Sequence, residues 1–291
     1  MKMPRFCYHR PRSTEEALHL LAEHGDEAKI LAGGQSLLPL MALRLSQPAH
    51  VIDIGHVADF AGIDERDGSV VIGAIVRHAD VEHSALVASS APLVSAAVPF
   101  IGHRAIRNMG TACGSLAHAD PAGELPAVAL ALDAELVVRR LDGERTIPAA
   151  DFFLGYLDSD IGDGELLSEL RLPPWSPSAG WSVQEVSRRH GDYALLGLAA
   201  VVDSDSSGRI RGAALSLFGA GSTPVRTPDA EQLLAGQPPS EELFRAAGDA
   251  VMRGIDPPAD NHATTAYRRH VAGVLTRRCL TEATQRMGVR A

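Results

Sequence analysis

Two glycine-bearing segments hold the residue types that could bind a ligand carrying phosphate groups. In the first, a short apolar run at residues 30–32 leads into Gly33 and Gly34, and Ser36 then opens a second apolar run. Glycine allows the backbone to approach an anion closely and to adopt a positive φ, and N–H groups at the start of a helix point towards it. A plain strand–turn–helix connection would use glycines too, so this segment alone leaves both interpretations open.

The second segment, residues 108–126, combines small and hydroxyl side chains with acidic ones. Thr111, Gly114 and Ser115 could serve phosphates, whereas the carboxylate of Glu124 could accept hydrogen bonds from sugar hydroxyls. Together the two segments favour a ligand that contains a diphosphate and a ribose or ribityl chain. The alternative for the second segment is a buried turn followed by a capped helix.

Other cofactor motifs are broken or missing in the sequence. The stretch Gly219-Ala-Gly221 approaches a dinucleotide-binding fingerprint, but Pro224 stands where the third glycine is needed. The sequence has no P-loop pattern and no G-x-S-x-G nucleophile motif. Its three cysteines form no C-x-x-C pair and are too few to hold an iron–sulfur cluster, and the histidine spacing predicts no metal site. We therefore expect no metal in this chain.

Composition and charge narrow the class of protein further. The chain of 291 residues is long enough for one or two domains with a large hydrophobic core. Its formal net charge of −9 argues against a nucleic-acid partner and against an anionic membrane surface. The apolar runs are too short for a membrane span. Because the few cysteines are unpaired, a reducing compartment is favoured, and we expect a soluble cytoplasmic protein.

Local sequence patterns predict an α+β protein of two domains. A capping box at Ser13 and Glu16 starts the first helix, which should end at Gly25. The proline-rich stretch at residues 173–180 predicts a stiff connector, so we place one domain at residues 1–175 and another at 176–291. Strands are expected at 30–32, 51–54, 70–74, 135–139, 166–172, 181–187, 195–203 and 210–218, and the main helices at 77–87, 91–98, 127–132, 229–234, 241–252 and 264–286.

Three motifs in their order along the chain resemble one known family. They are Ala32-Gly-Gly-Gln-Ser36, the segment that runs from Ile101 through Thr111 to Pro126, and Arg188-Arg-His-Gly-Asp-Tyr-Ala194. This combination resembles the FAD-binding medium subunits of the molybdenum hydroxylases, the relatives of carbon monoxide dehydrogenase and xanthine dehydrogenase. The resemblance implies a two-part N-terminal FAD-binding domain of the PCMH or vanillyl-alcohol-oxidase type. It also implies a small C-terminal α+β domain of the carbon monoxide dehydrogenase flavoprotein type, with three or four strands and helices.

The resemblance also implies which residues touch FAD. Tyr193 would lie near the flavin ring, where it could shield one face or gate access, although a core tyrosine is the alternative. We cannot choose between Leu166 and Leu167 for the position that lines the adenine or flavin end. The full set of implied cofactor-binding residues is Lys29, Ala32, Gly33, Gly34, Gln35, Ser36, Leu37, Ile101, Thr111, Gly114, Ser115, Glu124, Leu166, Leu167, Arg188 and Tyr193.

Some residues near these motifs have two interpretations. His103, Arg104 and Arg107 could be cofactor ligands, or they could brace the segment by binding nearby carbonyl groups. Relatives commonly have a second glycine where this chain has Cys113. Either Cys113 adopts an ordinary φ, which we favour because Gly114 remains available, or FAD binding is altered.

The implied role is electron transfer within a larger enzyme. A large subunit would hold the molybdopterin cofactor and a small subunit the [2Fe-2S] clusters, while this chain would take electrons from those clusters and pass them through FAD to an external acceptor. A dimer of heterotrimers is the family expectation. The alternatives are a stand-alone FAD-dependent oxidase or dehydrogenase of the same superfamily and a cofactor-free assembly subunit. The substrate and the acceptor do not follow from this sequence.

Overall fold

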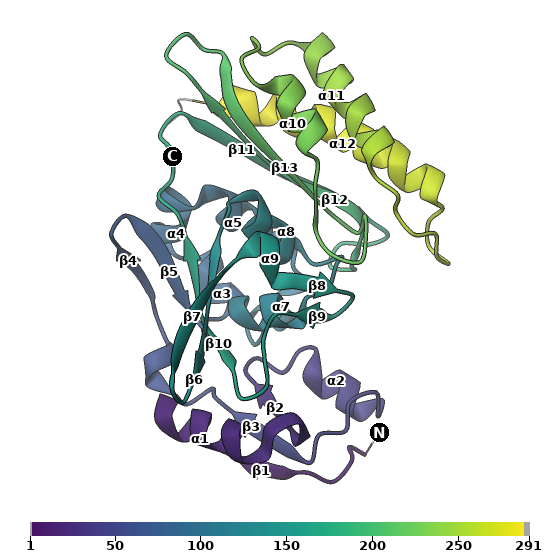
Figure 1. Ribbon diagram of the computed structural model, residues 1–291. Helices are drawn as coiled ribbons and strands as arrows, with labels where there is room; N and C mark the ends of the chain where they lie inside the picture. Colours follow the sequence, from purple (N-terminus) through teal and green to yellow (C-terminus); the bar gives the residue numbers. More distant parts are fainter. Residues whose placement is uncertain (1, 288–291) are drawn as a thin grey trace.

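The computed structural model describes residues 2–287, arranged as three larger sheets and a two-stranded sheet, β8-β9, with helices around them (Figure 1). The helices are α1 Thr14–His24, α2 Leu37–Ala42, α3 His78–Glu82, α4 Ala85–Ser90, α5 Pro92–Ala97, α6 Arg104–Arg107, α7 Ala112–His118, α8 Glu124–Ala131, α9 Ala149–Phe152, α10 Pro228–Leu234, α11 Glu241–Gly254 and α12 Thr265–Arg286. The strands are β1 Cys7–His9, β2 Ala28–Leu31, β3 His50–Asp53, β4 Ile63–Arg66, β5 Ser69–Gly73, β6 Glu135–Arg140, β7 Gly143–Pro148, β8 Phe153–Gly155, β9 Asp158–Ser159, β10 Leu166–Leu172, β11 Ala179–Ser187, β12 Ala194–Ser204, β13 Ile210–Phe218 and β14 Val225–Arg226.

A small parallel sheet at the N-terminus leads into the first glycine segment. Its strand order is β1-β3-β2, and β3 pairs with both neighbours in parallel. Helix α1 starts where the capping box predicts, since the Ser13 hydroxyl accepts from the N–H of Glu16 at 3.2 Å. Its residues Ala17, Leu18 and Leu21 are buried with Ile52 of β3. This packing holds the end of β2 in place immediately before Gly33.

A second, five-stranded sheet supports the other glycine segment. Its order is β4-β5-β10-β6-β7, with antiparallel neighbours throughout. Helix α7 contacts both β5 and β10. On the inner face, Ile72, Leu136 and Leu170 are fully buried, so α7 rests on a rigid apolar layer.

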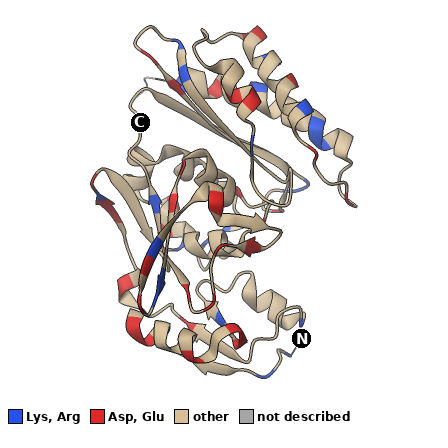
Figure 2. Cartoon of the chain, viewed as in Figure 1, with Lys and Arg blue, Asp and Glu red and all other residues tan. Residues whose placement is uncertain are grey.

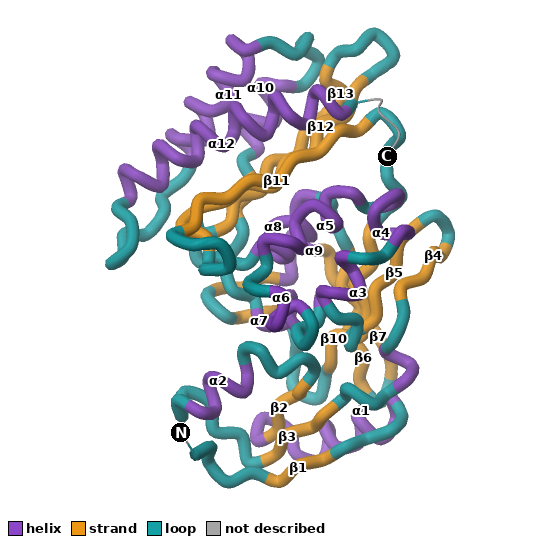
Figure 3. The backbone as a smooth tube through the Cα atoms, turned by 180° about the vertical axis from the view of Figure 1, so that it is seen from behind, coloured by secondary structure: helices purple, strands orange, loops and turns teal. Residues whose placement is uncertain are grey.

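The third sheet, β11-β12-β13-β14, is covered on both faces (Figure 3). Alternate residues along β12 belong to different cores, because successive side chains of a strand point to opposite faces. Ala199 belongs to the core that includes α5 and α8, whereas Leu198 and Ala200 belong to the core formed with α11 and α12. The sheet is therefore a layer shared by both parts of the chain.

Most of the expected elements are confirmed, within a few residues at their ends. The prediction of one helix over residues 77–87 is wrong, because the chain turns at His83 and Ser84 and the Ser84 hydroxyl caps α4. Residues 112–118, for which no helix was predicted, form α7. The strands β1, β4 and β7 were not predicted, since their mostly exposed side chains lack a clear apolar alternation.

Within residues 2–287, no helix is long and apolar enough to cross a membrane.

Candidate functional site

The two glycine segments touch each other through their backbones. A Cβ atom on Gly33 would lie 2.3 Å from the carbonyl oxygen of Met109 and 2.6 Å from the Cα of Gly110. Such distances are too short for any side chain, so only glycine permits the contact. Gly114 also faces the first segment, since a Cβ atom added to it would lie 3.9 Å from the Ala32 methyl group. Residues far apart in the sequence therefore form one continuous surface.

The first segment presents unpaired backbone donors. Gly34 has φ of 72°, as expected for a left-handed turn that favours glycine. Within residues 2–287, the backbone N–H groups from Gly33 to Leu37 donate no hydrogen bond to the protein, while the Gln35 side chain donates to the carbonyl of Gly33 at 3.1 Å. A row of free N–H groups in a glycine turn is a site where phosphate oxygens can bind.

The second segment is ordered by its own helix cap. Thr111 is the N-cap of α7, and its hydroxyl accepts from the N–H of Gly114 at 3.2 Å. The Ala112 N–H donates to the carbonyl of Val76, which ties α7 to the segment before α3. Ser115 lies half-buried one residue further along α7. This arrangement places Thr111 directly against Gly33, because the Gly33 Cβ position is 2.9 Å from the Thr111 nitrogen.

A cavity of about 530 Å³ opens beside this junction. Ala32 lines it from the first glycine segment, and Met109 and Thr111 line it from the second. The rest of the lining comes from the turn around Gly55, from residues 61–63 and from the segment before α3 and α4: Gly55, Ala61, Gly62, Ile63, Ile75, Val76, Arg77, Asp80 and Ser84. The volume and the mixed apolar and polar lining suit part of a nucleotide-sized ligand.

Arg107 is a structural brace, which settles one of the two interpretations left open by the sequence. Its guanidinium group is buried, pairs with Glu82 at 2.8 Å and donates to the carbonyls of Ile101 and Gly102 at 3.3 and 3.2 Å. These bonds fix the turn that contains Ile101. The loop of residues 188–193 packs on this turn, because a Cβ on Gly191 would lie 2.5 Å from the His103 ring.

A group of acidic and phenolic side chains lies where the third sheet meets α8. Glu124, the first residue of α8, is buried, and burial raises its pKa to about 8, with smaller contributions from Glu185 and Asp120. Burial also raises the pKa of Glu185 to about 7, and its Oε2 atom is buried without a hydrogen-bond partner among residues 2–287. At neutral pH Glu124 is therefore largely protonated and can donate as well as accept a hydrogen bond, unlike the carboxylate expected from the sequence.

Tyr193 belongs to this group but remains accessible. Its side chain is 65% exposed. The pKa of its hydroxyl is raised by partial burial and by the carboxyl groups of Asp120 and Glu124. Tyr156, from the turn between β8 and β9, contributes to the same shift, so it lies nearby. The alternative of a buried core tyrosine is wrong for Tyr193.

Of the implied cofactor-binding residues, Ala32 and Thr111 line the cavity and the others do not. Gly33 and Gly114 lie beside it at the junction of the two segments, and Glu124 and Tyr193 belong to the group where the third sheet meets α8. Lys29 is exposed on β2, and Arg188 is exposed and lies 3.3 Å from Nδ1 of His262. Leu166 and Leu167 are both buried in the main core on β10, where neighbouring residues face opposite sides of the sheet. Cys113 has an ordinary φ, and its thiol points at the carbonyl of Ile72 rather than towards the cavity. Burial raises the pKa of this thiol to about 12, so it is unreactive.

The sequence did not reveal three parts of this site. Met109 and Gly110 form the contact with Gly33. Gly110 also packs against the buried His78 ring, since a Cβ atom added to Gly110 would lie 3.0 Å from that ring. Glu185, on β11, lies close enough to Glu124 to raise its pKa. Gly110 lies inside the second motif and could have been chosen, whereas the pairing of Glu124 with Glu185 depends on tertiary packing alone. The residues present fit a dinucleotide such as FAD, with glycine cradles and free N–H groups at one point and hydroxyl and carboxyl groups at another.

Two family models together match nearly the whole chain. The model described as the FAD binding domain in molybdopterin dehydrogenase matches residues 4–175. The model described as the CO dehydrogenase flavoprotein C-terminal domain matches residues 181–283.

Individual relatives agree with the family models. The chain is 42% identical to the 6-hydroxypseudooxynicotine dehydrogenase complex subunit alpha of Paenarthrobacter nicotinovorans, over 98% of this chain and 97% of that protein. It is 40% identical to the nicotine 6-hydroxylase medium subunit of the same organism, over 97% and 99%. A solved structure of carbon monoxide dehydrogenase from Hydrogenophaga pseudoflava, lacking the Mo-pyranopterin moiety of its cofactor, has a TM-score of 0.95 and 36% identity, covering 99% of this chain and all of that chain.

Proposed function

Because this chain belongs to the FAD-binding medium subunits of the molybdenum hydroxylase family, an oxidoreductase family, we propose that it transfers electrons through FAD. The electrons would come from the [2Fe-2S] clusters of a small partner subunit and go to an external acceptor. A large partner subunit would hold the molybdopterin cofactor and act on the substrate, in a dimer of heterotrimers. The contact between Gly33 and residues 109–111 is the observation that best supports this proposal, because it joins the two glycine segments beside one cavity.

We assign the diphosphate to the junction of the glycine segments. The free N–H groups from Gly33 to Leu37 donate to it, and Ala32 and Thr111 close its two sides. Gln35, Ser36, Gly114 and Ser115 complete the cradle. The capped start of α7 keeps this surface in place before the ligand arrives, so little ordering is needed on binding.

Residues at the boundary with the third sheet serve the other end of the ligand. Glu124 binds ribityl or ribose hydroxyls through its protonated carboxyl group, while Ile101 contacts the ligand from the turn that Arg107 braces. Tyr193 covers the flavin end and controls what reaches it. FAD supplies the redox chemistry when bound, and the protein holds it, limits water and leaves one edge open. Like most of the implied residues, Lys29, Arg188, Leu166 and Leu167 do not line the cavity, and we assign these four a supporting role.

The first test is the cofactor content of the purified full-length chain. We expect a visible flavin spectrum and about one FAD per chain released by denaturation. A Gln35→Ala, Ser36→Ala double variant should retain less FAD, whereas Leu43→Ala, an exposed position just after α2, should retain as much as the parent. A chain that fails to take up added FAD, alone and together with its partner subunits, would contradict the proposal.

The second test separates a medium subunit from a stand-alone enzyme. The FAD-loaded chain is mixed with an N-heterocyclic substrate, with and without the co-expressed large and small subunits, and the visible absorbance is followed anaerobically. We expect bleaching only in the complex, and slower delivery to an artificial acceptor in a Tyr193→Leu complex. Substrate turnover by the isolated chain would favour the stand-alone oxidase instead.

A further inference from the structure

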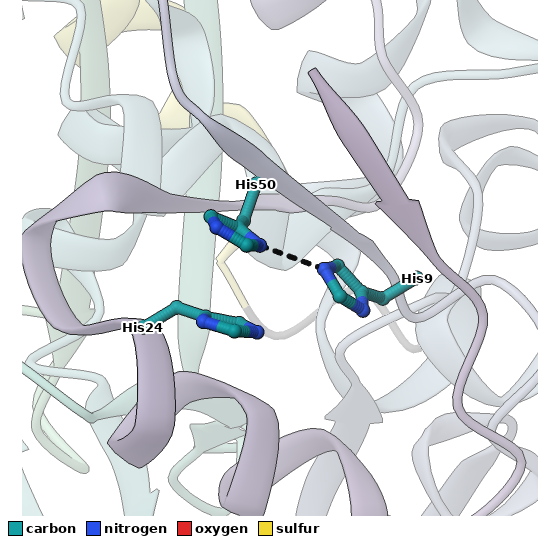
Figure 4. Close-up of side chains that lie close together, drawn as sticks. All are labelled: His9, His24 and His50. Carbon is teal, nitrogen blue, oxygen red and sulfur yellow. Dashed lines mark hydrogen bonds between the residues drawn. The ribbon is translucent and has the colours of Figure 1, made fainter.

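Three histidines from separate elements meet at the N-terminal sheet, away from the cofactor cavity (Figure 4). His9 belongs to β1, His24 to the last turn of α1 and His50 to β3. One ring nitrogen from each lies within 4.8 Å of the other two, and all three residues are half-buried. Their spacing of 15 and 26 residues in the sequence matches no metal motif, so only the fold brings them together.

The contacts within the cluster leave most of its nitrogens without a protein partner. Nε2 of His9 and Nδ1 of His50 share a hydrogen bond of 2.9 Å, and the His24 ring stacks on His50 with centroids 3.6 Å apart. Among residues 2–287, the His24 ring makes no hydrogen bond, and no carboxylate forms an ion pair with any of the three rings. A histidine with a purely structural role usually has a hydrogen-bond partner for its ring nitrogens. Here only the bond between His9 and His50 is of that kind.

Acidic residues are concentrated on α1 and the turn after it. Residues 13–28 include Glu15, Glu16, Glu23, Asp26 and Glu27 and no lysine or arginine, and Glu23 acts on the pKa of His9, whereas Arg10 and Lys29, basic residues beside this segment, are exposed. Figure 2 shows several acidic positions, in red, along α1 next to the N-terminal sheet. Three protonated imidazoles at this separation would repel one another, whereas three neutral imidazoles around a cation satisfy both the rings and the nearby negative charge.

We propose that His9, His24 and His50 form a binding site for a divalent transition-metal ion of the zinc class. Imidazole nitrogens suit zinc, and bonds of about 2.1 Å require ligand nitrogens roughly 3.0–3.4 Å apart. The ligand nitrogens now lie up to 4.8 Å apart, so binding would require the rings to turn out of their stack and come closer. His24 can turn because no hydrogen bond from residues 2–287 holds its ring. The three ligands leave a fourth position for water.

Such an ion would tie together β1, β3 and the end of α1. His24 is followed directly by Gly25 and then by β2, which ends two residues before Gly33. The ion would therefore reinforce the sheet from which the first glycine segment emerges, at the opposite end of β2 from that segment. Because the ion binds only the folded chain, it should raise the temperature of unfolding.

The test is a calorimetric titration of tag-free, full-length protein with Zn²⁺. A Cys7→Ser parent removes the exposed thiol of β1, which would bind zinc by itself. We expect one zinc per chain, and a loss of affinity of at least about 100-fold in His24→Gln and in His50→Gln, since even residues that only support a ligand contribute about 10–100-fold. His19→Gln, one turn earlier on α1 and outside the cluster, should bind like the parent.

Equal zinc affinity in the parent and in His24→Gln would overturn the proposal, as would the lack of saturable binding in the parent. If the histidine variants do not fold, the parent protein still tests the proposal, because Co²⁺ can be bound in place of Zn²⁺ and its absorption spectrum reports the coordination geometry. A tetrahedral Co²⁺ absorption spectrum, together with a higher unfolding temperature in Co²⁺ or Zn²⁺, is expected. An octahedral spectrum with no change in unfolding temperature would contradict a three-histidine site.

Discussion

Single residues decide whether the two glycine segments can meet. Gly33 has no room for a side chain, because three backbone atoms of residues 109–111 lie within 2.9 Å of its Cβ position. Thr111 serves both as helix cap and as cavity wall. The types and spacing of these residues were readable in the sequence. Their mutual contact was not, because it depends on how the N-terminal sheet packs on the second sheet.

At this scale, we expect Gly33→Val to separate the two segments. The added side chain must push against backbone, so the free energy of unfolding should fall by about 1–3 kcal/mol and FAD content should drop. Gly212→Ala on β13 is the matched control, since nothing lies within 4 Å of its Cβ position. Thermal unfolding and released FAD measure the two effects. Unchanged FAD content in a folded Gly33→Val protein would argue against our placement of the diphosphate.

At the scale of elements, local signals predicted some boundaries well and others poorly. Ser13 and Glu16 predicted the start of α1, because a cap acts through neighbouring residues. Helix α7 was missed, since Gly114 and Ser115 are weak helix formers and its stability comes from Thr111 and from packing on β10. Strand β7 was missed because most of its side chains are exposed and it is held by pairing with β6. The division at residues 175 and 176 stays a prediction.

One element-scale anchor lies close to Tyr193. Arg268, buried on α12, donates to the carbonyls of Leu195 and Gly219, at 2.9 Å for the latter. The N–H of Gly219 in turn donates to the carbonyl of Pro121 at 2.7 Å, beside Asp120. Helix α12 thus positions the loop that precedes Glu124.

We therefore expect Arg268→Met to weaken both folding and cofactor retention. Two carbonyl groups lose their charged donor, which should cost about 2–3 kcal/mol of unfolding free energy. Arg278→Met, an exposed change on the same helix, should cost little. Urea unfolding together with FAD release distinguishes the two variants. If Arg268→Met were as stable as Arg278→Met, this anchor would be of no consequence.

At the scale of the whole molecule, protonation links the two halves of the structure. Glu124 comes from α8 and Glu185 from β11, and burial raises their pKa values to about 8 and about 7. A carboxyl group whose pKa is higher in the folded state binds a proton that the unfolded chain releases. Its contribution to stability is therefore present at low pH and is lost as pH rises towards the folded pKa.

The expected result is a urea midpoint that falls between about pH 4.5, the ordinary pKa of a glutamate, and about pH 8 in the full-length chain, and that levels off above this range. A Glu124→Gln, Glu185→Gln double variant should flatten this dependence, because neither amide titrates. Glu242→Gln, exposed on α11, should leave the slope as it is. A midpoint that rises over this range, or an equal slope in the double variant, would contradict the assignment.

The packing of the third sheet bears on whether the two halves of the chain must be covalently linked. Leu198 and Ala200 face α11 and α12, whereas Ala199 and Phe218 face α5 and α8. The C-terminal half covers the Leu198 face with its own helices, but the face that carries Ala199 and Phe218 is buried only against the N-terminal half. The covalent link at residues 173–178 should therefore be dispensable once both halves exist. Fragments 2–175 and 176–287, which each leave this apolar face uncovered when expressed alone, should reassemble into one flavin-binding particle when expressed together.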